Sequence, residues 1–130
     1  MSDRPAADSL REVRFVKQVA GEGQRRWFAS GDMDLVVWFD AHKKISAFQL
    51  CYDKHRRERA LTWKRGQDGF EHALVDDGEA WPLAHKSTPI LVPDGDWNAA
   101  EVRARFLAGA AELPAAIREF IDARLASQAP

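Results

Sequence analysis

The densest group of potential metal ligands and acid–base residues lies in the segment HALVDDGE, residues 72–79. Asp77 and Glu79 stand on either side of a glycine, and their carboxylates could hold a hard cation weakly. His72 and Asp76 would share one face of a strand but lie about 13 Å apart along it, too far to bind one metal ion. An enzyme or weak metal site using His72 with these three carboxylates is one hypothesis. The DDG sequence is also typical of a hairpin turn, and we favour that interpretation.

A second cluster is basic and lies in the segment KHRRER. Its side chains could contact the phosphate or carboxylate of an anionic ligand, and together with Arg25 and Arg26 they could bind nucleic acid. Charged residues in a turn are more commonly only solvated, so the solvated turn is the favoured interpretation. The candidate anion-binding residues are Lys54, His55, Arg56, Arg57 and Arg59.

Other reactive side chains have less support. The four histidines show neither H-x-x-x-H nor H-x-E spacing, so a zinc site is not expected. Cys51 has cationic residues nearby in sequence, but no positioned base accompanies it, and a structural cysteine is predicted. No cofactor is predicted.

Aromatic and basic residues alternate in RRWF, residues 25–28, and TWKR, residues 62–65. This composition resembles a surface that stacks on single-stranded nucleic acid, but stacking requires exposed rings. Trp63 would lie beside Leu61 on the predicted core side of a strand. Trp38 and Trp63 are therefore predicted to be core residues, and nucleic acid binding is possible but not favoured.

Hydrophobic runs separated by polar turns of four or five residues predict an antiparallel meander. Alternation within the runs predicts a core face that carries Phe48, Leu50 and Tyr52 on one strand. Leu61 and Trp63 on the next strand face the same way. The opposite face carries small and polar side chains and is expected to be solvated or lightly covered. The runs span residues 33–40, 45–53, 59–65 and 70–76.

The flanking segments are predicted by different signals. The segment after residue 8 fits either a helix begun by a Ser9–Glu12 capping box or two strands joined at AGEG, and alternation favours two strands. Apolar residues at helical spacing predict two C-terminal helices, with Asp96 as a candidate N-cap and Pro114 near the start of the second helix. PILV, residues 89–92, is a candidate short edge strand.

Together these patterns predict an α+β fold. An antiparallel β-meander of four to six strands, roughly residues 11–76, is followed by two amphipathic helices, roughly residues 97–126, packed on one face. A chain of 130 residues suits one domain, which is expected to span residues 9–126. The ends, residues 1–8 and 127–130, are expected to be flexible.

Charge is segregated along a chain whose formal net charge is only −1. Residues 43–65 contain eight basic and two acidic side chains, whereas residues 66–101 contain eight acidic side chains and one basic one. In a meander, the turns at residues 54–58 and 76–79 would lie at the same end of the sheet. Opposite charges placed in this way select a partner more than they stabilise a fold. The leading hypothesis is therefore a non-enzymatic interaction or assembly module that binds another copy of itself or another protein.

Cysteine content and hydropathy bear on the cellular location. A single cysteine excludes an intramolecular disulfide and fits a reducing compartment. The sequence shows neither a secretion signal nor a run of about 20 apolar residues. A cytoplasmic location without membrane contact is therefore expected.

Overall fold

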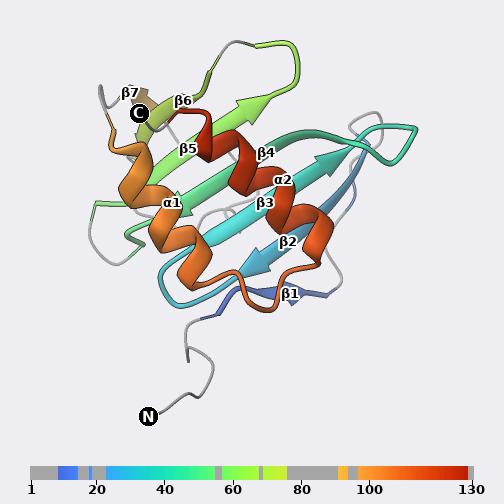
Figure 1. The fold of residues 1–130 in the computed structure, drawn as a ribbon, viewed down its shortest axis with the longest axis horizontal. Coiled ribbons are helices and arrows are strands. Elements are labelled where there is room, and N and C mark those ends of the chain that lie inside the picture. Colours follow the sequence, from blue (N-terminus) through green and yellow to red (C-terminus); the bar gives the residue numbers. More distant parts are fainter. Residues whose placement is uncertain are drawn as a thin grey trace.

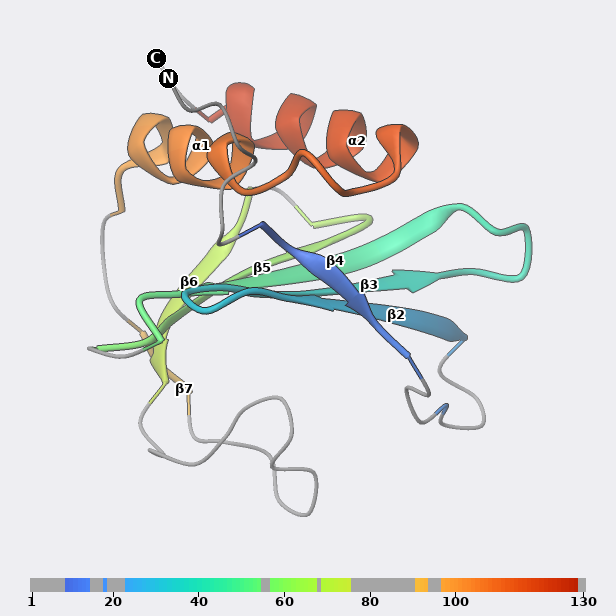
Figure 2. The same ribbon diagram turned by 90° about the horizontal axis from the view of Figure 1, so that it is seen from below.

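The computed structural model describes residues 9–14, 18, 23–54, 57–67, 69–75, 91–93 and 97–128. These residues form one antiparallel sheet with two helices on a single face, as Figures 1 and 2 show. The strands are β1 (Arg11–Val13), β2 (Gln24–Ala29), β3 (Asp34–Phe39), β4 (Ile45–Tyr52), β5 (Arg59–Lys64), β6 (Glu71–Val75) and β7 (Leu91–Pro93). The helices are α1 (Ala99–Ala108) and α2 (Ala115–Ala126). Neither described helix is both long and apolar enough to cross a lipid bilayer.

The order of strands in the sheet follows the order in the chain, and each strand is antiparallel to its neighbours. β1 to β6 form the predicted meander, and β7 corresponds to the predicted edge strand in PILV. The α+β prediction is therefore confirmed. β1 and β2 also confirm strands rather than a helix near the N-terminus. Glu12 caps no helix there: it lies opposite Phe28 in the sheet, and its carboxylate binds Arg26.

The hydrophobic core lies between the helices and the sheet face beneath them. Phe48, Leu50 and Leu61 are fully buried on that face, as alternation predicts, and Trp63 is partly buried at its margin. Helical spacing in turn determines which side chains of α1 and α2 meet the sheet. The buried residues of the two helices include Val102, Phe106, Ile117, Ile121 and Leu125.

The helices begin close to their predicted positions. The N-cap of α1 is Asn98, whose side-chain oxygen accepts a hydrogen bond of 2.9 Å from the backbone N–H of Glu101. The predicted cap, Asp96, lies outside the described residues. Pro114 occupies the N-cap of α2, where its missing N–H costs nothing because the first amides of a helix have no partner within it.

The outer face of the sheet, opposite the helices, contains buried side chains. Cys51 and Ala60 form a buried cross-strand pair, and Gln49 is buried beside them. Trp38 also points to this outer face and lies outside the hydrophobic core, so the prediction that it is a core residue is wrong. The run DLVVWF is apolar on both faces, and alternation alone cannot decide which face the helices cover.

Several predictions fall outside the described residues, namely the flexible end at 1–8, the last two residues of the tail and the acidic turn at 76–79. The described strands do show at which end of the sheet the chain enters the segment after β6. Arg59 of β5 pairs with Leu74 of β6, so the chain leaves β6 at the same end of the sheet where it enters β5. The predicted basic turn therefore lies beside the end of β6.

Candidate functional site

A cavity of about 270 Å³ lies at the end of the sheet where β4 turns into β5, beside the first turns of α1. Strands contribute Tyr52, Arg59 and His72 to its lining, and the helix contributes Glu101 and Arg105. We call this cavity the Arg105 pocket. It brings together charged and aromatic side chains that are far apart in the sequence.

Three aromatic rings form one wall of the Arg105 pocket. The Tyr52 hydroxyl and Nε2 of His72 lie 2.5 Å apart. The His72 ring stacks on Trp97 with a centroid distance of 5.8 Å and an interplanar angle of 19°. The guanidinium of Arg105 lies over the Tyr52 ring, 5.2 Å from its centroid. Tyr52 comes from β4, His72 from β6 and Trp97 from the segment before α1. Contacts between three separate elements therefore hold this wall in place.

The register of the sheet explains how these groups meet. Tyr52 pairs with Arg59, and Leu61 pairs with His72, so Tyr52 and His72 share a face and meet diagonally across β5.

Asp53, which follows Tyr52 in the chain, has a φ of 60°, which aspartate adopts more readily than most residues. Its carboxylate lies 3.6 Å from the guanidinium of Arg59.

Arg105 connects α1 to two turns of the sheet. Its Nη2 donates hydrogen bonds to Oδ2 of Asp32 at 2.6 Å and to Oδ1 of Asp53 at 2.8 Å. These two hydrogen bonds raise the pKa of the guanidinium above its ordinary value, and the bond to Asp53 has the larger effect. Among the described residues, Nε and Nη1 of Arg105 have no hydrogen-bond partner. Its remaining N–H groups can therefore donate to a ligand.

His72, a candidate catalytic residue, does not present a ring nitrogen to solvent. Nε2 is engaged by the Tyr52 hydroxyl, and Nδ1 is buried. The ring is stacked against both Tyr52 and Trp97. In this geometry His72 holds the aromatic wall in position through its contacts with Tyr52 and Trp97.

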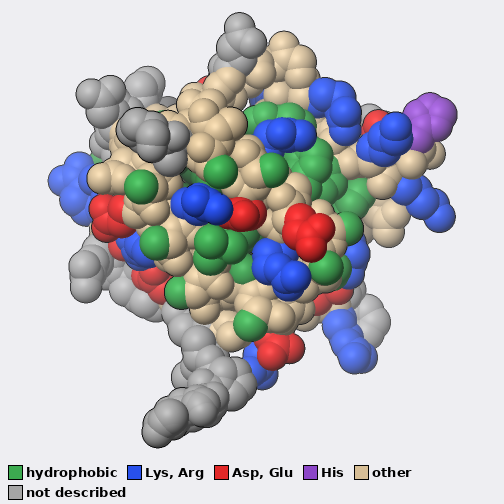
Figure 3. Space-filling view, viewed as in Figure 1, with side chains coloured by type: hydrophobic (Ala, Val, Ile, Leu, Met, Phe, Trp, Pro, Cys, Tyr) green, Lys and Arg blue, Asp and Glu red, His purple; other side chains and the backbone are tan. Residues whose placement is uncertain are grey.

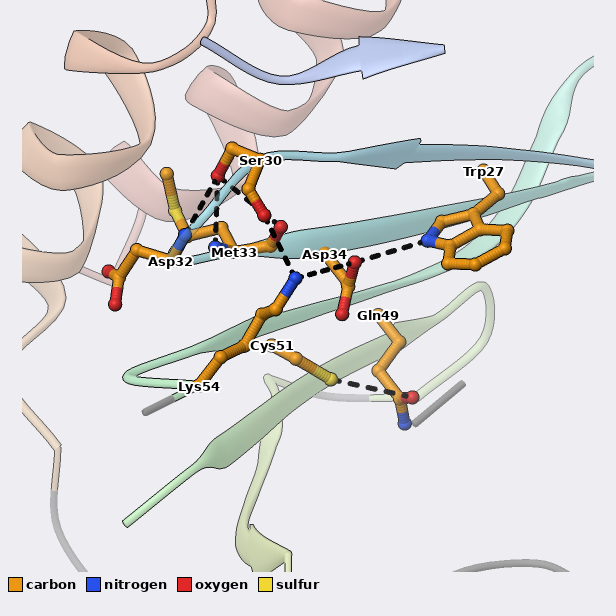
Figure 4. Close-up of polar contacts among 8 residues, drawn as sticks. All are labelled: Trp27, Ser30, Asp32, Met33, Asp34, Gln49, Cys51 and Lys54. Atoms are coloured by element: carbon orange, nitrogen blue, oxygen red, sulfur yellow. Dashed lines mark hydrogen bonds and ion pairs between the residues drawn. The ribbon is translucent and has the colours of Figure 1, made fainter. Parts of the chain in front are cut away.

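A buried carboxylate lies on the outer face at the same end of the sheet (Figure 4). Asp34 is only 2% exposed, and its Oδ1 accepts hydrogen bonds from Nε1 of Trp27 at 3.2 Å and from Nζ of Lys54 at 3.3 Å. Lys54 also donates to the backbone carbonyl of Ser30 at 2.9 Å. Removal from water raises the pKa of Asp34, and the positive charge of Lys54 partly opposes that effect.

Glu58 shares the environment of this ion pair. Burial raises the pKa of Glu58 to about 7. The negative charge of Asp34 is the second cause in size, and the positive charge of Lys54 acts in the opposite direction. Its Oε2 is buried, and no described residue donates a hydrogen bond to it. Two carboxylates therefore share one ammonium group here, and Glu58 holds its proton up to about neutral pH.

The variant Glu58→Gln is expected to flatten the pH dependence of stability. Between the ordinary pKa of 4.5 and the folded value of about 7, the folded state binds a proton that the unfolded state has lost, so wild-type stability falls as pH rises. The full shift would correspond to about 3 kcal/mol. Because Glu58 is only partly buried, we expect the variant to be about 1 kcal/mol more stable than wild type above neutral pH.

Urea unfolding of both proteins at about pH 5 and about pH 8 would measure this difference. Glu112→Gln, the same change at an exposed position before α2, is the matched control. If the wild-type and Glu58→Gln stabilities differ by the same amount at both pH values, Glu58 does not titrate as described.

The structure separates the predicted anion-binding residues. Lys54 binds Asp34 on the outer face, whereas Arg59 lines the Arg105 pocket on the helix face, and Arg57 is exposed. The described part of the chain contains no group of three or more His, Cys, Asp or Glu side chains placed to bind a metal ion. The predicted site residues outside the described part are His55, Arg56, Asp76, Asp77 and Glu79.

Sequence reasoning missed Arg105, Asp32 and Asp34. Arg105 meets its two partners across 73 and 52 residues of sequence, and no local pattern marks such a pairing. Asp34 did leave a signal, because it lies on the same strand face as Val36 in an apolar run, and a buried carboxylate requires a partner.

Comparison with known proteins adds no family to this description. The chain matches no protein-family model, and no match was found among curated proteins or solved structures.

Proposed function

We propose that the protein is a cytoplasmic binding module for a small organic anion held in the Arg105 pocket. The observation that carries this proposal is the guanidinium of Arg105, which two carboxylates fix through one nitrogen while the side chain lines the cavity. The remaining Nε–H and Nη1–H groups of this fixed guanidinium can each donate a charge-assisted hydrogen bond to an oxygen of a carboxylate or phosphate. The buried, unbridged thiol of Cys51 fits a reducing compartment.

The start of α1 supports the binding of an anion. Asn98 lines the pocket, and its side chain binds the amide of Glu101. The amides of Ala99 and Ala100 have no hydrogen-bond partner among the described residues. The N-terminus of a helix carries a partial positive charge and unused N–H donors, both of which favour an anionic group.

Charge balance limits what the pocket can bind. Arg59 and Arg105 bring two positive charges to its lining, and Asp53 and Glu101 bring two negative charges. A chain of phosphates would meet these carboxylates repeatedly, whereas one anionic group can contact the guanidinium alone. The aromatic wall, which includes Trp97, favours a ligand whose remaining part is apolar or aromatic.

Arg105→Lys is expected to weaken ligand binding between about 10-fold and 100-fold, because a compact ammonium cannot hold Asp32 and Asp53 as the planar guanidinium does and also present further N–H donors to the ligand. Ligands would first be found by screening small carboxylates and phosphates for changes in the indole resonance of Trp97 in NMR spectra. Titration of each variant with the best ligand then gives its dissociation constant.

Arg103→Lys is the matched control, since Arg103 lies on the same helix but pairs with Asp122 instead of lining the pocket. Thermal unfolding of both variants shows whether each remains folded at the temperature of the titration. Equal affinities for wild type and a folded Arg105→Lys variant would rule out the proposed anion contact.

Self-association, the leading hypothesis from the charge pattern, stays a prediction. The pairing of Arg59 with Leu74 supports its premise that the basic turn lies at the rim where β6 ends. Among the described residues, Leu107 is the one large hydrophobic side chain that is strongly exposed. An interface formed by the described surface would therefore be largely polar and sensitive to salt.

A further inference from the structure

A second surface, independent of the Arg105 pocket, lies on the outer face near the turn between β3 and β4. Cross-strand pairing aligns Arg25, Trp38, Ala47 and Lys64 in one row over four strands. Trp38 is partly exposed and Lys64 is exposed. Ala47, which lies between them, is too small to cover the indole ring. We call these four residues the Trp38 row.

The neighbouring turn adds positive charge to the Trp38 row. Lys43 and Lys44 are exposed in this turn, which extends beyond the helices in Figure 2, and Figure 3 shows basic side chains gathered at the same end. Within the described residues, Lys43, Lys44 and Lys64 form no ion pair. The carboxylate of Asp40 instead accepts hydrogen bonds from the turn's own backbone, at 2.8 and 3.0 Å.

A second indole lies next to the row. Trp27 pairs with Val36, two residues before Trp38, so the two tryptophans are diagonal neighbours on the same face. The bond from Trp27 to the buried Asp34 fixes its ring. Glu71 is the acidic residue of the adjoining part of this face, one cross-strand row away opposite Thr62. Among the described residues, basic side chains thus outnumber acidic ones around this pair of indoles.

We propose that the Trp38 row, together with Lys43 and Lys44, binds single-stranded nucleic acid. An unpaired base can stack on the indole of Trp38, and the exposed lysines can contact the phosphates on either side of it. A duplex keeps its bases stacked on one another, so it could use only the lysines. The charge of the surface is complementary to phosphate, and its aromatic centre distinguishes a base-stacking surface from a merely basic one.

Fluorescence anisotropy with labelled single-stranded DNA and RNA of about 12 nucleotides would test the proposal at about 50 mM and about 200 mM salt. For wild type, we expect a plot of the logarithm of the association constant against the logarithm of the salt concentration to have a slope of about −2, the value for three lysine–phosphate contacts. Trp38→Ala is expected to lower the affinity by about 10-fold, the loss of one stacked base. Lys64→Gln is expected to reduce the salt slope.

Arg57→Gln is the matched control, because it removes one exposed positive charge at the opposite end of the sheet. A loss of affinity as large as that of Lys64→Gln would place the binding surface on the turn at residues 54–59 and overturn the proposal. Absence of binding at the lower salt concentration would also overturn it. The proposal would also be overturned if Trp38→Ala binds the nucleic acid as tightly as wild type and heparin displaces the nucleic acid completely. That result would indicate attraction between charges without stacking.

Discussion

Replacing Phe48 with alanine is expected to lower the free energy of unfolding by about 4 kcal/mol. The Phe48 side chain is fully buried, and its ring lies among three aromatic neighbours. Their centroids are 5.7 Å away for Trp63, 5.9 Å for Phe70 and 6.5 Å for Phe120. The truncation removes buried apolar surface and leaves a cavity that these rigid neighbours cannot fill completely.

Urea unfolding followed by circular dichroism would measure the loss. Phe120→Ala serves as the comparison, since Phe120 belongs to the same aromatic cluster but is only partly buried, and a loss of about 2 kcal/mol is expected there. If Phe48→Ala costs no more than Phe120→Ala, full burial of Phe48 among these rings does not contribute the stability described.

The same substitution has a second consequence, for the Arg105 pocket. Phe70 lies 5.4 Å from Trp97, which in turn stacks on His72. A continuous chain of aromatic contacts therefore runs from Phe48 to the wall of the pocket. Loosening the core at Phe48 should weaken ligand binding even though Phe48 is not among the residues that line the pocket.

Lys54→Met is expected to lower the free energy of unfolding by about 3 kcal/mol at slightly alkaline pH. The side chain of Asp34 is 3% exposed, and Lys54 is the cation that compensates its charge. Methionine keeps most of the aliphatic length but leaves the carboxylate buried with only the indole N–H of Trp27 as a donor. An uncompensated buried charge costs far more than a surface ion pair contributes.

Chemical unfolding at about pH 8 measures this loss, and Arg57→Met provides the control for removing a positive charge from the same turn. The control should change stability by less than about 0.5 kcal/mol. The double variant Asp34→Asn/Lys54→Met is expected to recover at least half of the loss, since position 34 no longer carries a buried charge. A single Lys54→Met variant as stable as the control would falsify the buried pair.

The fold class followed from local patterns because each strand from β3 to β6 is a short hydrophobic run that ends at a polar turn. Alternation alone assigns Phe48 and Leu50 on β4 and Leu61 on β5 to one face of the sheet. The face that the helices would cover was harder to assign for β3, whose residues are apolar on both sides. Trp38 was misplaced for that reason.

The candidate site could be predicted only in part, because the register of the sheet and the position of α1 create it. Arg59 was predicted as an anion ligand, but Lys54, five residues earlier, turns to the other face to meet Asp34. No local sequence pattern identifies Arg105, because the two carboxylates that position it lie in separate turns. Neighbours in the sequence thus serve different faces, and neighbours in space come from distant segments.

The strictly sequential order of the strands has a consequence for how the protein is made. As the chain leaves the ribosome, each new strand can join the one before it, so the sheet can grow one hairpin at a time. The apolar face that includes Leu35, Phe48 and Leu61 remains open to water until α1 and α2 have been synthesised and have emerged. Chaperones and proteases would meet this face on any nascent chain that stops before α2.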